Sequence, residues 1–230
     1  MQVLVLASRK GGSGKTTLAG HLAVEAERRG AGPVAMIDID PQGSLADWWN
    51  VREAAAPLFV RTAYPSLARD LERLRAQGIK LLIVDTPPSL GDEVRAVVRQ
   101  ADLVAIPTRP SPHDLRSIGA TVDMVEQLGK GLVFIINSAT RNARITTETV
   151  TLLSQHGPLV PAVIHHRVDF ASSMIDGRTV MELPGAAPAA NEVGQLWDYL
   201  SQRLNTQERR PVLPRLPALR PMREALSATG

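Results

Sequence analysis

The stretch Lys10-Gly11-Gly12-Ser13-Gly14-Lys15-Thr16-Thr17 decides the fold of this 230-residue chain. It follows the apolar, strand-like run Gln2–Ala7 and opens the helix-like run Lys15–Arg29. Glycines between a strand and a helix let backbone N–H groups converge on phosphate oxygens, and the helix N-terminus adds partial positive charge. The stretch therefore predicts a loop that binds MgATP. Lys15 is expected over the β- and γ-phosphates, and the Thr16 hydroxyl on Mg²⁺.

This loop departs from the common phosphate-loop pattern at one position. The common pattern places a glycine six residues before the loop lysine, and here that position is Arg9. A second lysine, Lys10, stands at the start of the loop instead. We expect the whole stretch from Lys10 to Thr17 to contact the nucleotide.

Apolar runs alternate with helix-like runs along the chain. The predicted strands are 2–7, 34–37, 58–60, 79–84, 103–106, 131–136 and 159–164. The predicted helices are 15–29, 45–52 (with Ser44 as its cap), 67–77, 92–100, 115–128, 146–155, 170–175 and 192–205. Because the strands are apolar throughout, both faces of the sheet must be covered. The pattern predicts an α/β fold with a doubly wound, mainly parallel sheet and helices on both faces.

Three aspartates follow predicted strands. Asp85 ends one strand, at the place where a phosphate-loop fold carries its magnesium-organising carboxylate. Asp38 and Asp40 end another strand and are separated by one residue, so they can point along the same crevice. One of them is expected to hold a magnesium-bound water and the other to orient the attacking water. A strand-terminating cap at Asp85 and a simple turn at 38–41 are the plain alternatives.

Composition limits the remaining possibilities. The chain has no cysteine, which excludes disulfides and thiolate metal sites and suits a reducing cytoplasm. No apolar run approaches the roughly 18 residues that would span a bilayer. The formal net charge of +3 resides in residues 207–230, which are rich in arginine and proline. We expect two parts, an ATPase domain over 1–206 and a mobile Arg/Pro-rich tail over 207–230.

These motifs together resemble a known family. The loop at 10–17, Asp38-Ile39-Asp40-Pro41-Gln42 and Ile83-Val84-Asp85-Thr86-Pro87-Pro88 form the deviant-Walker pattern of ParA/MinD ATPases. The match is closest to the ParA branch, in a short form without an N-terminal DNA-binding extension. It covers roughly residues 2–205, with weaker similarity at 110–115 and at 166–180.

The resemblance implies a switch that dimerises around two ATP molecules. Lys10 would cross to the partner's nucleotide and neutralise phosphate charge there. Asp40 would position the hydrolytic water, and Asp38 would support the magnesium shell. Asn137, which ends a strand, would approach the adenine, with a turn-capping role as the alternative. The cofactors are then ATP and Mg²⁺, and Lys10, Lys15 and Asp40 are the catalytic candidates.

ATP-bound dimers of the ParA type resemble one another in binding DNA without sequence preference. Candidate phosphate contacts are Arg167, Arg203, Arg209 and Arg210. A ParB-like or other adaptor protein would stimulate hydrolysis and release the dimer. The resemblance thus implies a cytoplasmic, nucleoid-associated protein that segregates or positions a cargo.

Two other functions stay open at this point. One is a MinD-like, membrane-associated positioning ATPase, although prolines interrupt the tail where MinD-like proteins carry an amphipathic helix. The other is a metabolic ligase related to dethiobiotin synthetase, in which Lys10 has no role across a dimer.

Overall fold

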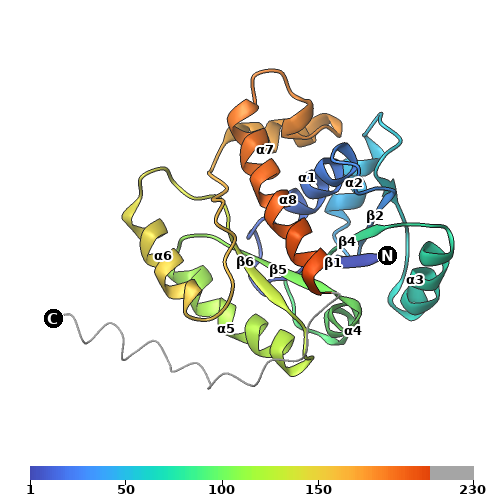
Figure 1. Ribbon diagram of the computed structural model, residues 1–230, viewed down its shortest axis with the longest axis horizontal. Helices are drawn as coiled ribbons and strands as arrows, with labels where there is room; N and C mark the ends of the chain where they lie inside the picture. The colour runs from blue at the N-terminus through green and yellow to red at the C-terminus, as the bar shows by residue number, and fades with distance from the viewer. Residues whose placement is uncertain (208–230) are drawn as a thin grey trace.

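Six parallel strands form a central sheet in the order β3-β2-β4-β1-β5-β6 (Figure 1). The computed structural model describes residues 1–207. The strands are β1 (Gln2–Leu6), β2 (Val34–Asp38), β3 (Leu58–Phe59), β4 (Leu81–Asp85), β5 (Leu103–Thr108) and β6 (Leu132–Ile136). β1 lies between β4 and β5, so the loop that follows it opens at the middle of the sheet's carboxyl edge.

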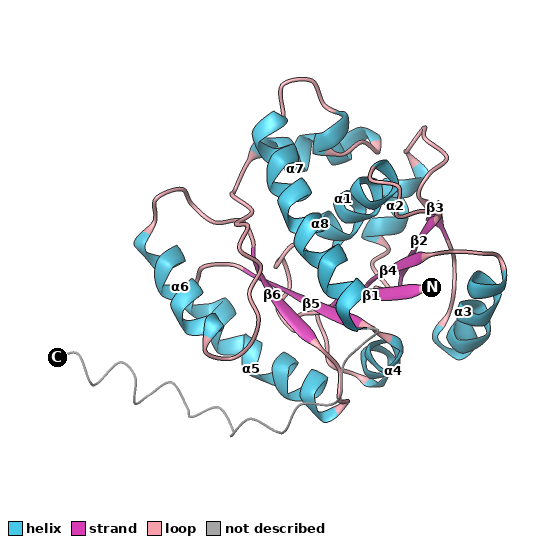
Figure 2. Cartoon of the chain, in the orientation of Figure 1, coloured by secondary structure: helices cyan, strands magenta, loops and turns pink. Residues whose placement is uncertain are grey.

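Helices cover both faces of this sheet (Figure 2). The α-helices are α1 (Lys15–Arg28), α2 (Ser44–Asn50), α3 (Leu67–Ala76), α4 (Asp92–Gln100), α5 (Pro112–Gln127), α6 (Arg144–Ser154), α7 (Val168–Ser173) and α8 (Ala187–Gln207). Short 3₁₀ turns lie at Tyr64–Ser66, Met174–Asp176 and Val180–Glu182.

Successive strand residues point to opposite faces and so build two separate cores. Leu4 and Leu6 pack with α1, α2, α7 and α8, whereas Val3 and Val5 pack with α3, α4, α5 and α6. The predicted doubly wound α/β fold is therefore confirmed, and the sheet is parallel in every described pair.

The predicted strand at 159–164 is wrong. This segment runs beside β6, where the Val160 N–H bonds to the Phe134 carbonyl at 2.9 Å and the Ile164 N–H to the Ile136 carbonyl at 3.0 Å. Only isolated bridges form there, at Leu159 and His165. Pro161 lies in the middle of the segment and has no N–H to donate, so a continuous ladder is not built.

The predicted cap of α2 is also wrong. Ser44 is the first residue of the helix rather than its cap, and the capping position is Gly43, with φ 67°. The free N–H groups of Leu45 and Ala46 bond instead to Asp38 Oδ2, at 3.0 and 3.2 Å. A carboxylate from the end of β2 thus satisfies the start of α2.

Helix α8 closes the described part of the chain. It packs against α1, and near its end Asn205 accepts a 3.1 Å hydrogen bond from the side chain of Gln2. Gln207, the first residue of the predicted tail, belongs to α8, while the rest of that tail lies outside the described residues. Between residues 1 and 207, no helix has both the length and the apolar character to cross a membrane.

Candidate nucleotide-binding site

A cleft of about 700 Å³ lies at the carboxyl edge of the sheet, over the loop that follows β1. Loops after β1, β2, β4 and β5 contribute to it, and α2 and the turn at 174–176 form one wall. The lining residues are Gly11, Gly12, Gly14, Lys15, Thr16, Thr17, Asp40, Gln42, Ser44, Asp47, Trp48, Val51, Pro88, Arg109, Met174 and Ile175. The cleft is thus built where open α/β sheets bind their ligands.

The site residues predicted from the sequence divide into those that line the cleft and those that do not. Six of them line the cleft, namely Gly11, Gly12, Gly14, Lys15, Thr16 and Thr17, and Asp40 lies there with them. Lys10, Ser13, Asp38, Asp85 and Asn137 are not among the lining residues. Lys10 is exposed to solvent, whereas Ser13, Asp85 and Asn137 are buried.

Asn137 supports the loop from behind. Its Nδ2 donates a 2.7 Å hydrogen bond to the Ser13 carbonyl, so the end of β6 is joined directly to the loop after β1. Gly14 has φ +96°, and a Cβ on this residue would collide with Asn137 Nδ2. Glycine is required at position 14 for its left-handed backbone and for this close approach. A direct contact of Asn137 with adenine stays a prediction.

Thr16 and Asp85, the two residues predicted to hold a magnesium ion, lie in contact. Thr16 Oγ1 donates a 2.5 Å hydrogen bond to Asp85 Oδ2 at the end of β4. Burial raises the pKa of Asp85 to about 7, against the stabilising effects of the Thr16 hydroxyl and Lys15. A hydroxyl and a carboxylate at the foot of a phosphate loop are the donors that Mg²⁺ prefers, and a divalent cation would compensate the buried charge. These residues fit the predicted ion.

Lys15 and Lys10 occupy different environments. Lys15 lines the cleft, and its Nζ lies 3.5 Å from the Lys10 carbonyl oxygen, to which it donates. Burial lowers the pKa of Lys15, and Asp85 and Asp40 oppose this shift. The side chain of Lys10 is free of ion pairs with any of residues 1–207. Lys15 thus lies inside the cleft, whereas Lys10 lies outside it with its side chain exposed to solvent.

The two aspartates after β2 also differ. Asp40 lines the cleft, and its Oδ1 accepts a 3.0 Å hydrogen bond from the Gln42 N–H. Asp38 accepts backbone N–H bonds on both oxygens, from Asp40 on Oδ1 and from the start of α2 on Oδ2. Burial raises the pKa of Asp38, although these three donors favour its charged form. Asp38 therefore positions α2, and the predicted magnesium-shell role of Asp38 stays a prediction.

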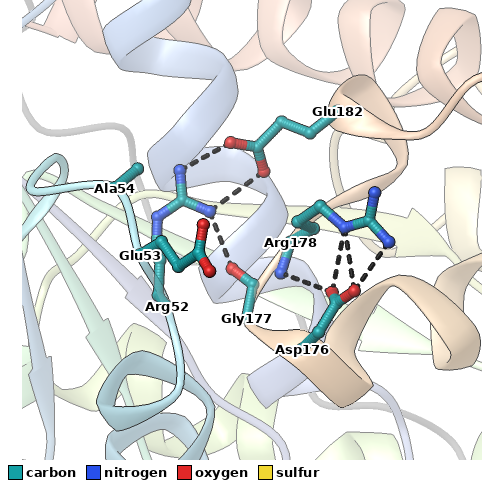
Figure 3. Close-up of a pocket in the computed structure, with 7 residues that line it drawn as sticks. All are labelled: Arg52, Glu53, Ala54, Asp176, Gly177, Arg178 and Glu182. Atoms are coloured by element: carbon teal, nitrogen blue, oxygen red, sulfur yellow. Dashed lines mark hydrogen bonds and ion pairs between the residues drawn. The ribbon is translucent and has the colours of Figure 1, made fainter.

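The far end of α2 is fastened to the segment 176–182 (Figure 3). The Arg52 guanidinium bonds to both carboxylate oxygens of Glu182, at 2.7 and 3.0 Å, and to the Gly177 carbonyl at 2.7 Å. The Trp48 indole N–H donates to the Arg178 carbonyl at 3.1 Å. We call these residues, 48 and 52 with 177–182, the α2 clasp. It fixes the cleft wall that carries Trp48 and Val51 next to the turn that carries Ile175.

The four arginines predicted to bind DNA lie in different environments. Arg167 is half-buried, and its guanidinium bonds to Glu192 Oε1 at 2.6 Å, so its charge is already paired. Arg203 lies on α8, where it stacks over the Tyr199 ring. Arg209 and Arg210 lie outside the described residues.

Several cleft residues were not predicted from the sequence. The face of α2, the apolar pair Met174 and Ile175, and Arg109 all line the cleft. Arg109 is the first residue after β5, and that position at the end of a strand beside β1 was the one available signal.

Comparison with known proteins identifies the class. Residues 4–180 match the profile of the CobQ/CobB/MinD/ParA nucleotide binding domain, CbiA. The match covers well over half of the chain, and the chain belongs to this family. The resemblance to ParA-type ATPases is thereby confirmed.

Individual proteins of known name are also similar to this chain. Maintenance of carboxysome distribution protein A of Halothiobacillus neapolitanus is 28% identical over 203 residues, covering 84% of this chain and 93% of that protein. Protein ParA of Rhizobium radiobacter is 37% identical over 122 residues, covering 52% of this chain and 54% of that protein. The septum site-determining protein MinD of Pyrococcus horikoshii, solved with Mg-ADP, has a TM-score of 0.73 at 16% identity, covering 91% of this chain and 99% of that one. This last likeness shows the shared fold.

Proposed function

We propose that this protein is an ATP-hydrolysing switch that dimerises on ATP, binds DNA without sequence preference and segregates or positions a cargo. The observation that carries the proposal is the composition of the cleft. A phosphate loop, Thr16 and Asp40 line it, Asp85 bonds to Thr16 from the end of β4, and Lys10 at the start of the same loop is exposed. A chain that only bound nucleotide would need neither Asp40 in the cleft nor an exposed second lysine.

Each side chain then has a distinct role. Thr16 and Asp85 hold the magnesium ion, which when bound neutralises charge on the β- and γ-phosphates. Lys15 binds the same phosphates from within the cleft. Asp40 orients the attacking water, because its carboxylate is the one after β2 that lines the cleft. Lys10 reaches the nucleotide of a second copy.

The wider biological role is supported by the relatives. ParA/MinD-type ATPases form dimers and use adaptor partners. The Halothiobacillus relative is named for carboxysome distribution and the Rhizobium relative is a ParA protein. We propose a cargo of the same general kind, a plasmid, a chromosomal region or a protein body, with release by an adaptor that stimulates hydrolysis on the nucleoid in the cytoplasm. The DNA contacts are assigned to Arg203, Arg209 and Arg210, and Arg167 is a weaker candidate because Glu192 neutralises it.

Substitution of Asp40 tests the proposal. Asp40→Ala should lower ATP turnover by about 100-fold, since the water loses its orienting base. The ATP-bound dimer should accumulate in light scattering after gel filtration, and should be retained on DNA at low salt. Asp123→Ala, an exposed carboxylate on α5, is the matched control and should behave as the unmodified protein.

Two results would contradict the proposal. Unchanged turnover in Asp40→Ala would remove the water-orienting role. Absence of DNA retention by the trapped ATP-bound form would remove the positioning mechanism. In the same assay Lys10→Ala should keep its ATP affinity and lose ATP-dependent dimerisation, whereas a metabolic ligase would show no effect of Lys10 on association.

A further inference from the structure

Arg109 is a cation of the nucleotide cleft to which the proposed function gives no role. It is exposed and lines the cleft together with Gly11, Gly12 and Lys15. Within residues 1–207 its guanidinium makes no hydrogen bond and no ion pair. By contrast, Arg52 is paired with Glu182 and Arg167 with Glu192.

The backbone that carries Arg109 is held in place. Pro110 and Pro112 restrict the chain on either side of Ser111. The Ser111 N–H bonds to the Arg109 carbonyl at 2.7 Å, and Ser111 Oγ accepts the Asp114 N–H at 3.1 Å as the cap of α5. The preceding residue, Thr108, accepts the Asn137 N–H at 2.9 Å. The backbone around Arg109 is therefore fixed by its neighbours, whereas the guanidinium has no partner among residues 1–207.

The position of this loop puts Arg109 on the phosphate side of the cleft. β5 is the direct neighbour of β1, whose carboxyl end leads into the phosphate loop. Pro88, after β4, approaches Gly11 from the other side at 3.8 Å from an ideal Cβ position. The loops after β4 and β5 thus flank the first glycines of the phosphate loop, and one of them carries an unpaired guanidinium.

We propose that Arg109 binds the terminal phosphate of the nucleotide held in its own cleft, an inference that rests on the proposed function. Guanidinium is planar and always charged, and its N–H groups match two phosphate oxygens at once. A contact to the γ-phosphate exists in ATP and is lost in ADP. Arg109 therefore contributes to the discrimination between the two nucleotides.

Nucleotide affinity measured by titration calorimetry tests this assignment. Arg109→Ala should weaken binding of a Mg-bound, non-hydrolysable ATP analogue by about tenfold, and binding of MgADP by less than about twofold, because a charge-assisted hydrogen bond is removed only from the triphosphate. Arg109→Lys should restore part of the difference, since it keeps the charge without the planar pair of donors. Arg116→Ala is the matched control, because this exposed arginine lies on α5 and is not part of the cleft.

The outcomes separate this inference from the proposed function. Equal weakening of both nucleotides, or unchanged affinity, would overturn the γ-phosphate contact. Loss of DNA retention with unchanged nucleotide affinity would also overturn it and would place Arg109 on the DNA. Lys15→Ala is measured alongside. If the unmodified protein binds neither nucleotide, the proposed function fails as well, whereas normal binding that is lost in Lys15→Ala leaves the proposed function standing.

Discussion

Gly14 has two independent reasons to be a glycine. Its backbone is left-handed, and its missing side chain leaves room for the Asn137 amide that bonds to the Ser13 carbonyl. The first reason is common to several glycines of this chain, such as Gly78 with φ +82°. The second applies to few of them. At Gly14 it arises because Asn137, after β6, supports the phosphate loop from behind, and Gly177 similarly leaves room for the backbone of Arg52.

Alanine substitutions can separate these reasons. Gly78→Ala, which meets open space, should cost about 1 kcal/mol of unfolding free energy from backbone strain alone. Gly14→Ala should cost about 2 kcal/mol more, because the methyl group also displaces Asn137. Urea denaturation measures both values. Combining Gly14→Ala with Asn137→Ala should recover part of the loss, and strict additivity of the two substitutions would contradict the steric explanation.

Residues differ in how far the sequence alone could place them. The placement of six phosphate-loop residues and of Asp40 along the cleft could be expected, because their types and spacing suit phosphate and metal ions. Lys10 and Ser13 belong to the same predicted loop but do not line the cleft. The role of Asp38 as the cap of α2 was not, because Ser44 is the better local candidate and only the fold brings Asp38 to the helix start. Arg109 was missed because a lone arginine in a proline-rich loop has no pattern until the cleft is assembled.

Helix α2 is a short element that is held at both ends. Asp38 satisfies its first N–H groups, and Arg52, beyond its last turn, closes the α2 clasp on Glu182. Only 4% of the Arg52 side chain is exposed, against 26% of Glu182. Arg178 and Asp176 form a second pair in the same pocket, but both side chains are about half exposed. The two pairs allow a direct comparison.

Removing one partner from each pair should have very different effects. Arg52→Ala should lower the free energy of unfolding by about 3 kcal/mol, because Glu182 is left partly buried without its counter-charge. Arg178→Ala should change it by about 0.5 kcal/mol or less, since water replaces the lost contact. Thermal or urea unfolding supplies the measurement. Similar losses in the two variants would show that burial of the α2 clasp does not set its strength.

Elements with a continuous apolar pattern were the predictable ones. All six strands were foreseen to within a few residues. Five of them are runs of largely buried, mostly aliphatic residues, whereas β3 is a two-residue edge strand that is not buried. The segment 159–164 has the same composition but was wrongly predicted. Its apolar side chains can pack beside β6. A continuous strand, however, needs a backbone N–H at each pairing position, and Pro161 has none.

On the scale of the whole molecule, His21 connects segments far apart in the chain. It lies on α1, one turn after Thr17, and is fully buried. Its Nδ1 bonds to the Thr17 carbonyl at 2.8 Å, which makes Nε2 the acceptor for the Val180 N–H at 3.2 Å. The neutral ring thus joins the helix of the phosphate loop to the segment of the α2 clasp. Burial lowers the pKa of His21 to about 4.

The stability of the molecule should therefore depend on pH through His21. Between about pH 6.5 and pH 4 the unfolded chain binds a proton at this residue that the folded chain does not. The free energy of unfolding should fall as pH is lowered through this window, by roughly 3 kcal/mol from His21 alone. In His21→Gln this contribution to the pH dependence of the unfolding free energy should vanish. His113 is exposed, and His113→Gln should keep the contribution of His21. Parallel stability–pH profiles for the unmodified protein and His21→Gln would contradict the assignment.

The global architecture followed from the alternation of apolar runs and helices, and the comparison of folds agrees with it. What could not be predicted is how the late segment 170–182 returns to α1 and α2. Its contacts depend on a buried imidazole and on a close approach at Gly177, where a Cβ would collide with the backbone of Arg52. Such contacts join residues more than 100 positions apart and leave no periodic trace in the sequence.

The rim of the cleft has one further consequence. Val51 and Ile175 are 53% and 79% exposed, although both line a cleft whose floor is ionic. While this rim is open, water reaches Arg109 and any bound phosphate, and the local dielectric constant is high. A surface pressed against the two aliphatic side chains would expel that water, and the same charges at the same distances would then attract several-fold more strongly. A partner that contacts only Val51 and Ile175 would in this way control the strength of the phosphate contacts inside the cleft.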